Sequence, residues 1–156
     1  MVKNDVPHLC FIGRWNPFHN GHAWMIKEVW SKHNYDEKRD VYGHMVRRLK
    51  SSQSPPILIM VRDTSYDEIP TDVRIRIIQN WLKDENLPGQ VIKIPDIVGV
   101  YWGRDVGYEV KEVEVPEDIK GISATQIRSA IHVKDRSWVD FVPRSVAKDL
   151  SEWMKE

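Results

Sequence analysis

The segment from Leu9 to His22, LCFIGRWNPFHNGH, constrains the fold of this chain more tightly than any other stretch. It begins with an apolar run over residues 9–12 that has the length and character of a buried strand. Gly13 follows, where the backbone can adopt conformations closed to other residues, and Asn16 and Pro17 are turn formers. Asn20 is a good N-cap for a helix with apolar residues at helical spacing. The segment therefore predicts a strand, a tight turn and the N-terminus of a helix.

Three side chains in this turn, Arg14, His19 and His22, can carry positive charge or donate hydrogen bonds. They accompany free backbone N–H groups and the positive end of a helix dipole, which together favour binding of an anion. A metal site is the weaker interpretation, because no cysteine or acidic residue lies near the two histidines in sequence to complete it. The turn is thus predicted to be a phosphate site with no metal held by side chains.

Two motifs resemble those of a known superfamily. Residues 13–22, GRWNPFHNGH, resemble the GRFxPFHxGH signature of HxGH nucleotidyltransferases, and residues 122–128, ISATQIR, resemble the ISxTxIR motif that closes over the nucleotide triphosphate. Residues 138–146 and 94–97 are similar to the closing helix and the third-strand exit of archaeal-type nicotinamide mononucleotide adenylyltransferases. The resemblance implies an α/β fold, a Rossmann-like open parallel sheet with helices on both faces.

Length, charge and cysteine content limit the kinds of protein that this chain can be. A chain of 156 residues is long enough for one domain, which we expect to span 1–156. The 23 basic and 23 acidic side chains balance, so no overall field attracts nucleic acid or an anionic membrane. The single Cys10 excludes a disulfide framework and is expected to be buried in its apolar run. Because neither a membrane-spanning run nor a leader is seen, the protein is expected to be soluble and cytoplasmic.

The rest of the chain alternates strand and helix patterns, which predicts right-handed crossovers and a parallel sheet. Residues 31–56 are expected to form an insertion with an amphipathic helix from Asp36. That helix is interpreted as a packing or subunit-contact element, which would allow a homo-oligomer, or as a lid over the site. The further expected elements are strands at 57–61, 91–94, 98–101 and 108–115, and helices that begin near residues 71, 123 and 143.

By resemblance, the catalytic residues are His19, His22 and Arg128. The histidines would stabilise charge on the α- and β-phosphates, while Arg14 and Arg128 would hold the outer phosphates. Ser123 and Thr125 would complete the cradle. Taken alone, Ser123 is better explained as a helix cap, and only the presence of the first motif favours nucleotide binding. The full set assigned to nucleotide binding is Gly13, Arg14, Gly21, Ser123, Thr125, Gly103 and Asp105, the last two because Gly103-Arg104-Asp105 is similar to a GxD turn of the superfamily.

Acceptor-binding residues are predicted where the second parallel strand ends. Arg62 and Asp63 follow an apolar strand at the edge of the sheet where open parallel sheets bind ligands. Trp102, at the end of another expected strand, would stack on a flat ring or pack in the core. Arg74, in the first turn of a helix, would reach a phosphate or lie in solvent.

The motifs contain no activated nucleophile, so direct in-line displacement at phosphorus is predicted, with Mg2+ bound to the nucleoside triphosphate. The resemblance implies ATP and nicotinamide mononucleotide as substrates, and NAD and pyrophosphate as products. Two alternatives remain open. One is a cytidylyltransferase that uses CTP to activate a phosphorylated sugar, polyol or headgroup, and the other is a non-catalytic nucleotide sensor, which would be expected to lack a histidine or Arg128.

Overall fold

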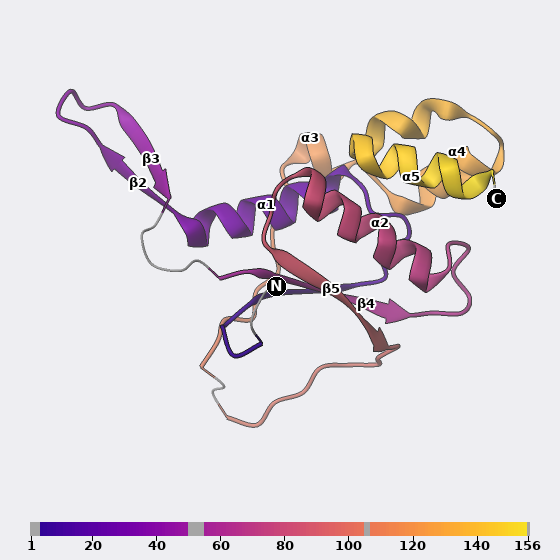
Figure 1. Ribbon diagram of the computed structural model, residues 1–156, viewed down its shortest axis with the longest axis horizontal. Helices are drawn as coiled ribbons and strands as arrows, with labels where there is room; N and C mark the ends of the chain where they lie inside the picture. The colour runs from indigo at the N-terminus through magenta and orange to yellow at the C-terminus, as the bar shows by residue number, and fades with distance from the viewer. Residues whose placement is uncertain (1–3, 50–54, 105–106, 156) are drawn as a thin grey trace.

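A computed structural model describes residues 4–49, 55–104 and 107–155 (Figure 1). Its centre is a parallel sheet in the order β1-β4-β5, formed by β1 (Leu9–Gly13), β4 (Ile57–Asp63) and β5 (Gly89–Pro95). α1 (Asn20–Asn34) lies in the connection from β1 to β4, and α2 (Thr71–Asp84) connects β4 to β5. The predicted Rossmann-like parallel sheet with helices is therefore confirmed, and the strands end at a common edge.

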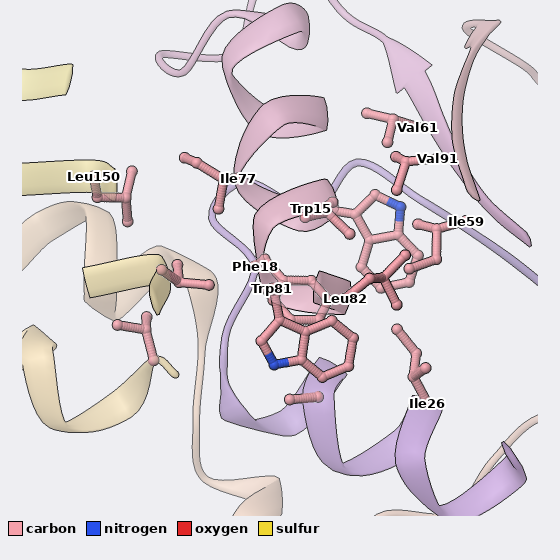
Figure 2. Packing of buried hydrophobic residues seen from close by; sticks show 14 of the residues in the cluster. Trp15, Phe18, Ile26, Ile59, Val61, Ile77, Trp81, Leu82, Val91 and Leu150 are labelled. Carbon is pink, nitrogen blue, oxygen red and sulfur yellow. The ribbon is translucent and has the colours of Figure 1, made fainter. Parts of the chain in front are cut away.

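The core lies between one face of the sheet and the two crossover helices. Phe11 pairs in register with Ile59, and Ile59 with Val91, and all three are buried. Figure 2 shows Ile59 and Val91 packed with the aromatic rings of Trp15, Phe18 and Trp81 and with aliphatic residues of α1 and α2. Each fully buried large side chain contributes about 1.5–3 kcal/mol to folding. Because both crossovers run in the same direction along the sheet, α1 and α2 share this face (Figure 1).

The opposite face of the sheet is only partly covered. Successive strand residues point to opposite faces, so the neighbours of Phe11, which are Cys10 and Ile12, point away from the helices and are exposed. The expectation that Cys10 is buried is wrong for this reason. No helix covers this face within the described ranges, so the expected second helical layer is not among the described elements. None of the described helices is long and apolar enough to cross a membrane.

The C-terminal part supplies a helical cap beside α2. It comprises α3 (Glu117–Lys120), α4 (Ala124–His132), a 3-10 helix η1 (Arg136–Phe141) and α5 (Arg144–Met154). The helices predicted to begin near residues 123 and 143 are thus confirmed. α5 packs against α2 through its buried Val146 and Leu150, and Asn80 Nδ2 donates a hydrogen bond to Asp149 Oδ2 at 2.9 Å.

The helix predicted from Asp36 is wrong, because residues 35–49 form an antiparallel hairpin of β2 (Tyr35–Arg39) and β3 (Met45–Leu49). The turn chemistry accounts for the error. Asp40 Oδ1 accepts the backbone N–H groups of Tyr42 and His44, each at 2.9 Å, and Gly43 has a positive φ of 81°. The hairpin projects beyond the end of α1, away from the sheet (Figure 1). Residues 50–54 of the predicted insertion lie outside the described residues.

Two expected strands, over 98–101 and 108–115, are also not formed. A segment with a strand pattern forms a strand only where its backbone can pair with another strand. β5 ends in Pro95, which has no N–H to donate. Gly107 has a φ of 77°, which breaks an extended run. Val98 and Tyr101 are almost completely exposed, so the apolar residues of this segment are not core residues.

Candidate active site

The two sequence motifs meet at the carboxyl end of β1, although they are 112 residues apart where they touch. Arg128 on α4 reaches back to the first motif, where its Nη1 donates to the backbone oxygen of Asn16 at 2.5 Å. The other guanidinium nitrogen, Nη2, donates to Thr125 Oγ1 at 3.2 Å, which fixes Arg128 against its own helix. The N-terminus of α4 and the start of α1 therefore border one site.

The N-cap of α1 is His19 and not the predicted Asn20. His19 Nδ1 accepts the backbone N–H of Gly21 at 3.0 Å, and His22 Nδ1 accepts the backbone N–H of His19 at 3.2 Å. This reciprocal pattern is a capping box in which two imidazoles replace the usual hydroxyl and carboxylate. Their rings stack with centroids 3.7 Å apart. Asn20 instead donates through Nδ2 to the backbone oxygen of Asp140 at 3.1 Å.

The capping bonds determine the protonation of both histidines. An imidazole whose Nδ1 accepts a hydrogen bond is neutral when its proton lies on Nε2. Burial lowers the pKa of His19 to about 4. Burial, together with the neighbouring His19, lowers the pKa of His22 well below its usual value. At neutral pH the pair therefore offers two N–H donors, which is the second of the two roles expected for these side chains, hydrogen-bond donation and not positive charge.

Positive charge comes from the two arginines. The Arg14 guanidinium is 38% exposed, with Nη2 at 3.5 Å from Asp67 Oδ1, and its Cζ lies 5.6 Å from the centroid of the Tyr66 ring. Arg128 is the second guanidinium, tied to Asn16 and Thr125 as described above. Two cations and two neutral N–H donors are a suitable set for a polyphosphate chain.

The tight packing of the first motif explains its two glycines. A Cβ at Gly13 would lie 2.9 Å from Trp15 Cε2, and a Cβ at Gly21 would lie 2.9 Å from His19 Cε1. Trp15, with a φ of 55°, turns its indole inward so that Nε1 donates to the backbone oxygen of Met60 at 3.1 Å. The Trp15 and His22 rings also pack edge to face, with their centroids 4.8 Å apart, so the Trp15 indole supports the His22 ring.

Ser123 is the N-cap of α4 as expected, and its Oγ accepts the backbone N–H of Gln126 at 3.5 Å. Thr125 accepts a hydrogen bond from Arg128. Both hydroxyls therefore stabilise the second motif through hydrogen bonds within α4.

Arg62 and Asp63 lie at the carboxyl end of β4, as predicted. Arg62 Nε donates to Asp96 Oδ1 at 2.8 Å, and Asp63 Oδ1 accepts from Thr71 Oγ1 at 2.8 Å. Asp96 could not be predicted as the partner of Arg62, because Asp96 follows β5 and meets Arg62 only since β4 and β5 are neighbours in the sheet. Tyr66, also missed, lies over Arg14 and donates through its hydroxyl to Asp96 Oδ2 at 3.3 Å.

Arg74 is not solvent-exposed, so that interpretation is wrong, and its buried guanidinium gives no support to the prediction of a phosphate contact. Its side chain is 1% exposed. Its guanidinium donates to the backbone oxygens of Ile69 at 2.8 Å and Arg14 at 2.5 Å, and to the hydroxyls of Thr64 and Thr71 at 2.9 and 2.8 Å. Arg74 thus joins the first motif to the loop after β4.

The structure does not place residues 102–104 beside the two motifs, as the prediction for this turn required. Trp102 is 52% exposed, and no atom lies within 4 Å of a Cβ built on Gly103. In Figure 1 this segment runs below the sheet, whereas α1 and α2 lie above it. Asp105, assigned to the same turn, lies outside the described residues.

A cavity of about 440 Å³ lies along α1 from Asn20 to Ser31, and neither His19 nor His22 is among the residues that line it. Asn20, Trp24 and Lys27 line it from α1, and Trp81, Ile119 and Pro143 line it from other elements. This cavity was not predicted from the sequence. The spacing of the three α1 residues places them on one helix face, but only the fold shows that residues of α3 and of the start of α5 line the same cavity.

Comparison with known proteins gives three archaeal relatives that each match about nine-tenths of this chain. "Nicotinamide-nucleotide adenylyltransferase 1" of Sulfolobus acidocaldarius is 30% identical over 162 residues, covering 91% of this chain and 87% of the relative. A nicotinamide-nucleotide adenylyltransferase of Methanococcus aeolicus is 28% identical over 166 residues, covering 90% of this chain and 86% of the relative.

The third relative, a nicotinamide-nucleotide adenylyltransferase of Ignicoccus hospitalis, is 28% identical over 170 residues, covering 91% of this chain and 90% of the relative. No family model and no solved structure matches the chain. The similarity extends over nearly the whole of both chains and includes one relative at 30% identity. The chain belongs to the nicotinamide-nucleotide adenylyltransferase family.

Proposed function

We propose that this protein transfers the adenylyl group of ATP to the phosphate of nicotinamide mononucleotide and forms NAD and pyrophosphate. The observation that carries the proposal is the hydrogen bond from Arg128 to Asn16, because it joins the two motifs around one anion site. The names of the three relatives support the choice of ATP and the mononucleotide.

The reaction is a direct displacement. A phosphate oxygen of the mononucleotide forms a bond to the α-phosphorus of ATP as the bond to the bridging oxygen breaks, and pyrophosphate leaves with that electron pair. Negative charge grows on the α- and β-phosphates, where the Nε2–H groups of His19 and His22 donate hydrogen bonds. Arg14 and Arg128 hold the outer phosphates. Such preorganised donors supply most of the catalysis when no covalent intermediate forms.

The neutral state of the histidines suits this role. A neutral N–H donor fixed by a backbone hydrogen bond needs no reorganisation as charge develops, and it does not lose a proton to the phosphate. Gly13 and Gly21 serve the same site through close packing, because a side chain at either position would displace a neighbouring ring. Ser123 and Thr125 hold the start of α4, and with it Arg128, against the triphosphate.

The nucleoside of ATP is proposed to occupy the cavity beside α1. Its volume of about 440 Å³ is within the range of small-molecule sites. Two tryptophans, Trp24 and Trp81, supply apolar lining, while Asn20 supplies a polar group one residue from His19.

Adenylyl transfer from ATP in general needs a divalent metal, and Mg2+ is the proposed ion. Among the described residues no cluster of three or more His, Cys, Asp or Glu side chains is placed to hold a metal ion. The donor set therefore fits an ion carried by the phosphate oxygens, which is the usual mode of Mg2+ with nucleotides. When bound, the ion would reduce the charge on the triphosphate, and the residues named above would perform the positioning.

The acceptor is proposed to bind at the carboxyl end of β4, near Arg62 and Asp63. Tyr66 is a better placed aromatic group than Trp102, because it is 64% exposed and lies directly beside Arg14. The roles of Trp102, Gly103 and Asp105 remain predictions from the sequence.

The alternative functions are not favoured. All three relatives are named as adenylyltransferases, which gives no support to CTP as the nucleotide. The chain keeps both histidines and Arg128, whereas a non-catalytic sensor would be expected to have lost one of them.

Pyrophosphate release by the purified protein with Mg2+ tests the proposal. ATP and CTP are each offered with nicotinamide mononucleotide, glycerol 3-phosphate and phosphocholine, and NAD is measured directly. We expect release only with ATP and the mononucleotide, with one NAD for each pyrophosphate. Release with CTP and either other acceptor would overturn the assignment, and so would binding of ATP without release from any pair.

A further inference from the structure

The carboxylate of Asp67 lies buried between two guanidinium groups in the loop that follows β4. Its side chain is 5% exposed. Oδ1 lies 3.5 Å from Arg14 Nη2, and Oδ2 lies 3.8 Å from Arg74 Nη1 and accepts a short hydrogen bond from the Thr64 hydroxyl. A buried carboxylate held by three partners has little freedom to move.

The same network holds the backbone of Arg14. Arg74 Nη1 donates to the Arg14 carbonyl oxygen at 2.5 Å, and Arg74 is itself fixed by the carbonyl oxygen of Ile69 at 2.8 Å. On its remaining side the Arg14 guanidinium faces the ring of Tyr66. Arg14 is thus held at its main chain by Arg74 and at its charged end by Asp67, although its side chain is 38% exposed.

The positive charge that an anion can reach in this network is on Arg14. Arg14 and Arg74 share the negative charge of Asp67, and Asp63 is linked to Arg74 through the Thr71 hydroxyl. The side chain of Arg74 is 1% exposed, whereas that of Arg14 is 38% exposed. Asp67 therefore restricts the position of Arg14 and leaves its guanidinium partly open to an anion.

We propose that Asp67 is a positioning residue that holds the Arg14 guanidinium in place for the triphosphate of the nucleotide. The proposal rests on the proposed function, in which Arg14 contacts the outer phosphates. Asp67 does not touch the substrate. It acts by keeping a long, partly exposed side chain in one orientation before the nucleotide arrives.

A double-mutant cycle tests this role. Asp67→Asn keeps the size of the side chain and removes its charge, and it is combined with Arg14→Ala. We expect Asp67→Asn to lower kcat/KM for ATP about ten- to hundredfold, a range typical of misplaced contacts, without raising KM for the acceptor. In the Arg14→Ala background the same change should have less than about a twofold effect, because the two residues act through one contact.

Glu68→Gln is the matched control. Glu68 is the next residue in the loop and is exposed, so the variant removes one acidic charge at nearly the same place. It should leave kcat/KM within about twofold of the unmodified protein, as surface changes usually do. Thermal unfolding of every variant separates loss of structure from loss of positioning. Asp67→Glu is used if Asp67→Asn does not fold, because it keeps the negative charge that Arg74 needs and only moves it.

Calorimetric titration with inorganic tripolyphosphate provides a readout that does not depend on any acceptor. Two results together support the proposal: Asp67→Asn binds tripolyphosphate more weakly than the unmodified protein, and the same change has no effect on binding when Arg14 is already alanine. This holds even if no NAD is formed and the proposed function fails. Equal losses in both backgrounds, unchanged binding in Asp67→Asn, or no binding to the unmodified protein would each overturn it.

Discussion

At the scale of single residues, the central feature is the use of two histidines as a reciprocal cap. In both His19 and His22, Nδ1 accepts a backbone N–H at the start of α1, so Nε2 carries the proton of the neutral ring. The same bonds that begin the helix therefore fix the orientation and the tautomer of the proposed catalytic groups. Helix capping and catalysis use different nitrogens of the same rings.

The low pKa of His19 predicts how stability depends on pH. The unfolded chain has a histidine pKa near 6.5, whereas burial lowers it in the fold to about 4. The unfolded state then binds more protons between these values, so the free energy of unfolding falls as pH falls from about 6.5 to 4. The slope from this group is about 1 kcal/mol per pH unit.

Urea unfolding at pH 7 and pH 5 measures this effect. His19→Asn is the control, because asparagine is a good N-cap that does not titrate. The control should lose part of the pH dependence. An equal slope in both proteins would mean that His19 is not neutral in the fold.

The substitution Gly21→Ala is expected to lower activity without a large loss of stability. In Gly21→Ala the new Cβ would lie 2.9 Å from His19 Cε1, so the imidazole must shift. A shift of this kind should lower kcat about tenfold or more, because a misplaced group loses much of its effect. Gly121→Ala is the control, since nothing lies within 4 Å of its added Cβ. Steady-state kinetics with full activity in Gly21→Ala would show that the position of His19 is not critical.

At the scale of helices and strands, the sequence predicted the elements whose formation depends on residues close together in the chain. The β1 strand, the turn and α1 follow from one continuous segment. α4 follows from its Ser123 cap, α2 and α5 follow from the prolines that precede them, and all three have apolar faces. The hairpin at 35–49 was missed because its apolar spacing also fits a helix, while the turn at Asp40 and Gly43 decides the outcome. The prediction of strands over 98–101 and 108–115 is wrong, because strand formation depends on a neighbouring strand to pair with, which the sequence does not specify.

The hairpin offers a prediction at this scale. Asp40→Ala removes the oxygen that accepts the N–H groups of Tyr42 and His44, and the tip of the hairpin should open. Hydrogen exchange at Met45 and Val46 should become faster. Because the hairpin projects away from the sheet, kcat and both KM values should change less than about twofold, as for other surface changes. A larger change in either KM would show that the hairpin takes part in substrate binding.

At the scale of the whole molecule, the site depends on long-range packing that the sequence could indicate only through its motifs. The motif residues were predicted, but their contacts were not, because they come from different elements. Arg74 shows this most clearly: its position in the first turn of a helix suggested a phosphate contact or a solvent-exposed side chain, whereas the fold buries it between the first motif and the loop after β4. Asp67, Asp96 and Tyr66 gain their roles in the same way, from sheet order.

The measurement that tests the account most directly is the comparison of turnover and ATP binding in His22→Ala. The account assigns His22 to charge that develops during the reaction, while Arg14 and Arg128 hold the ground-state triphosphate. NAD formation under saturating substrates should therefore fall by about a hundredfold or more, while the Kd for ATP, measured by calorimetry, should change less than about threefold. Unchanged turnover, or a fall in turnover fully explained by lost ATP binding, would contradict the account.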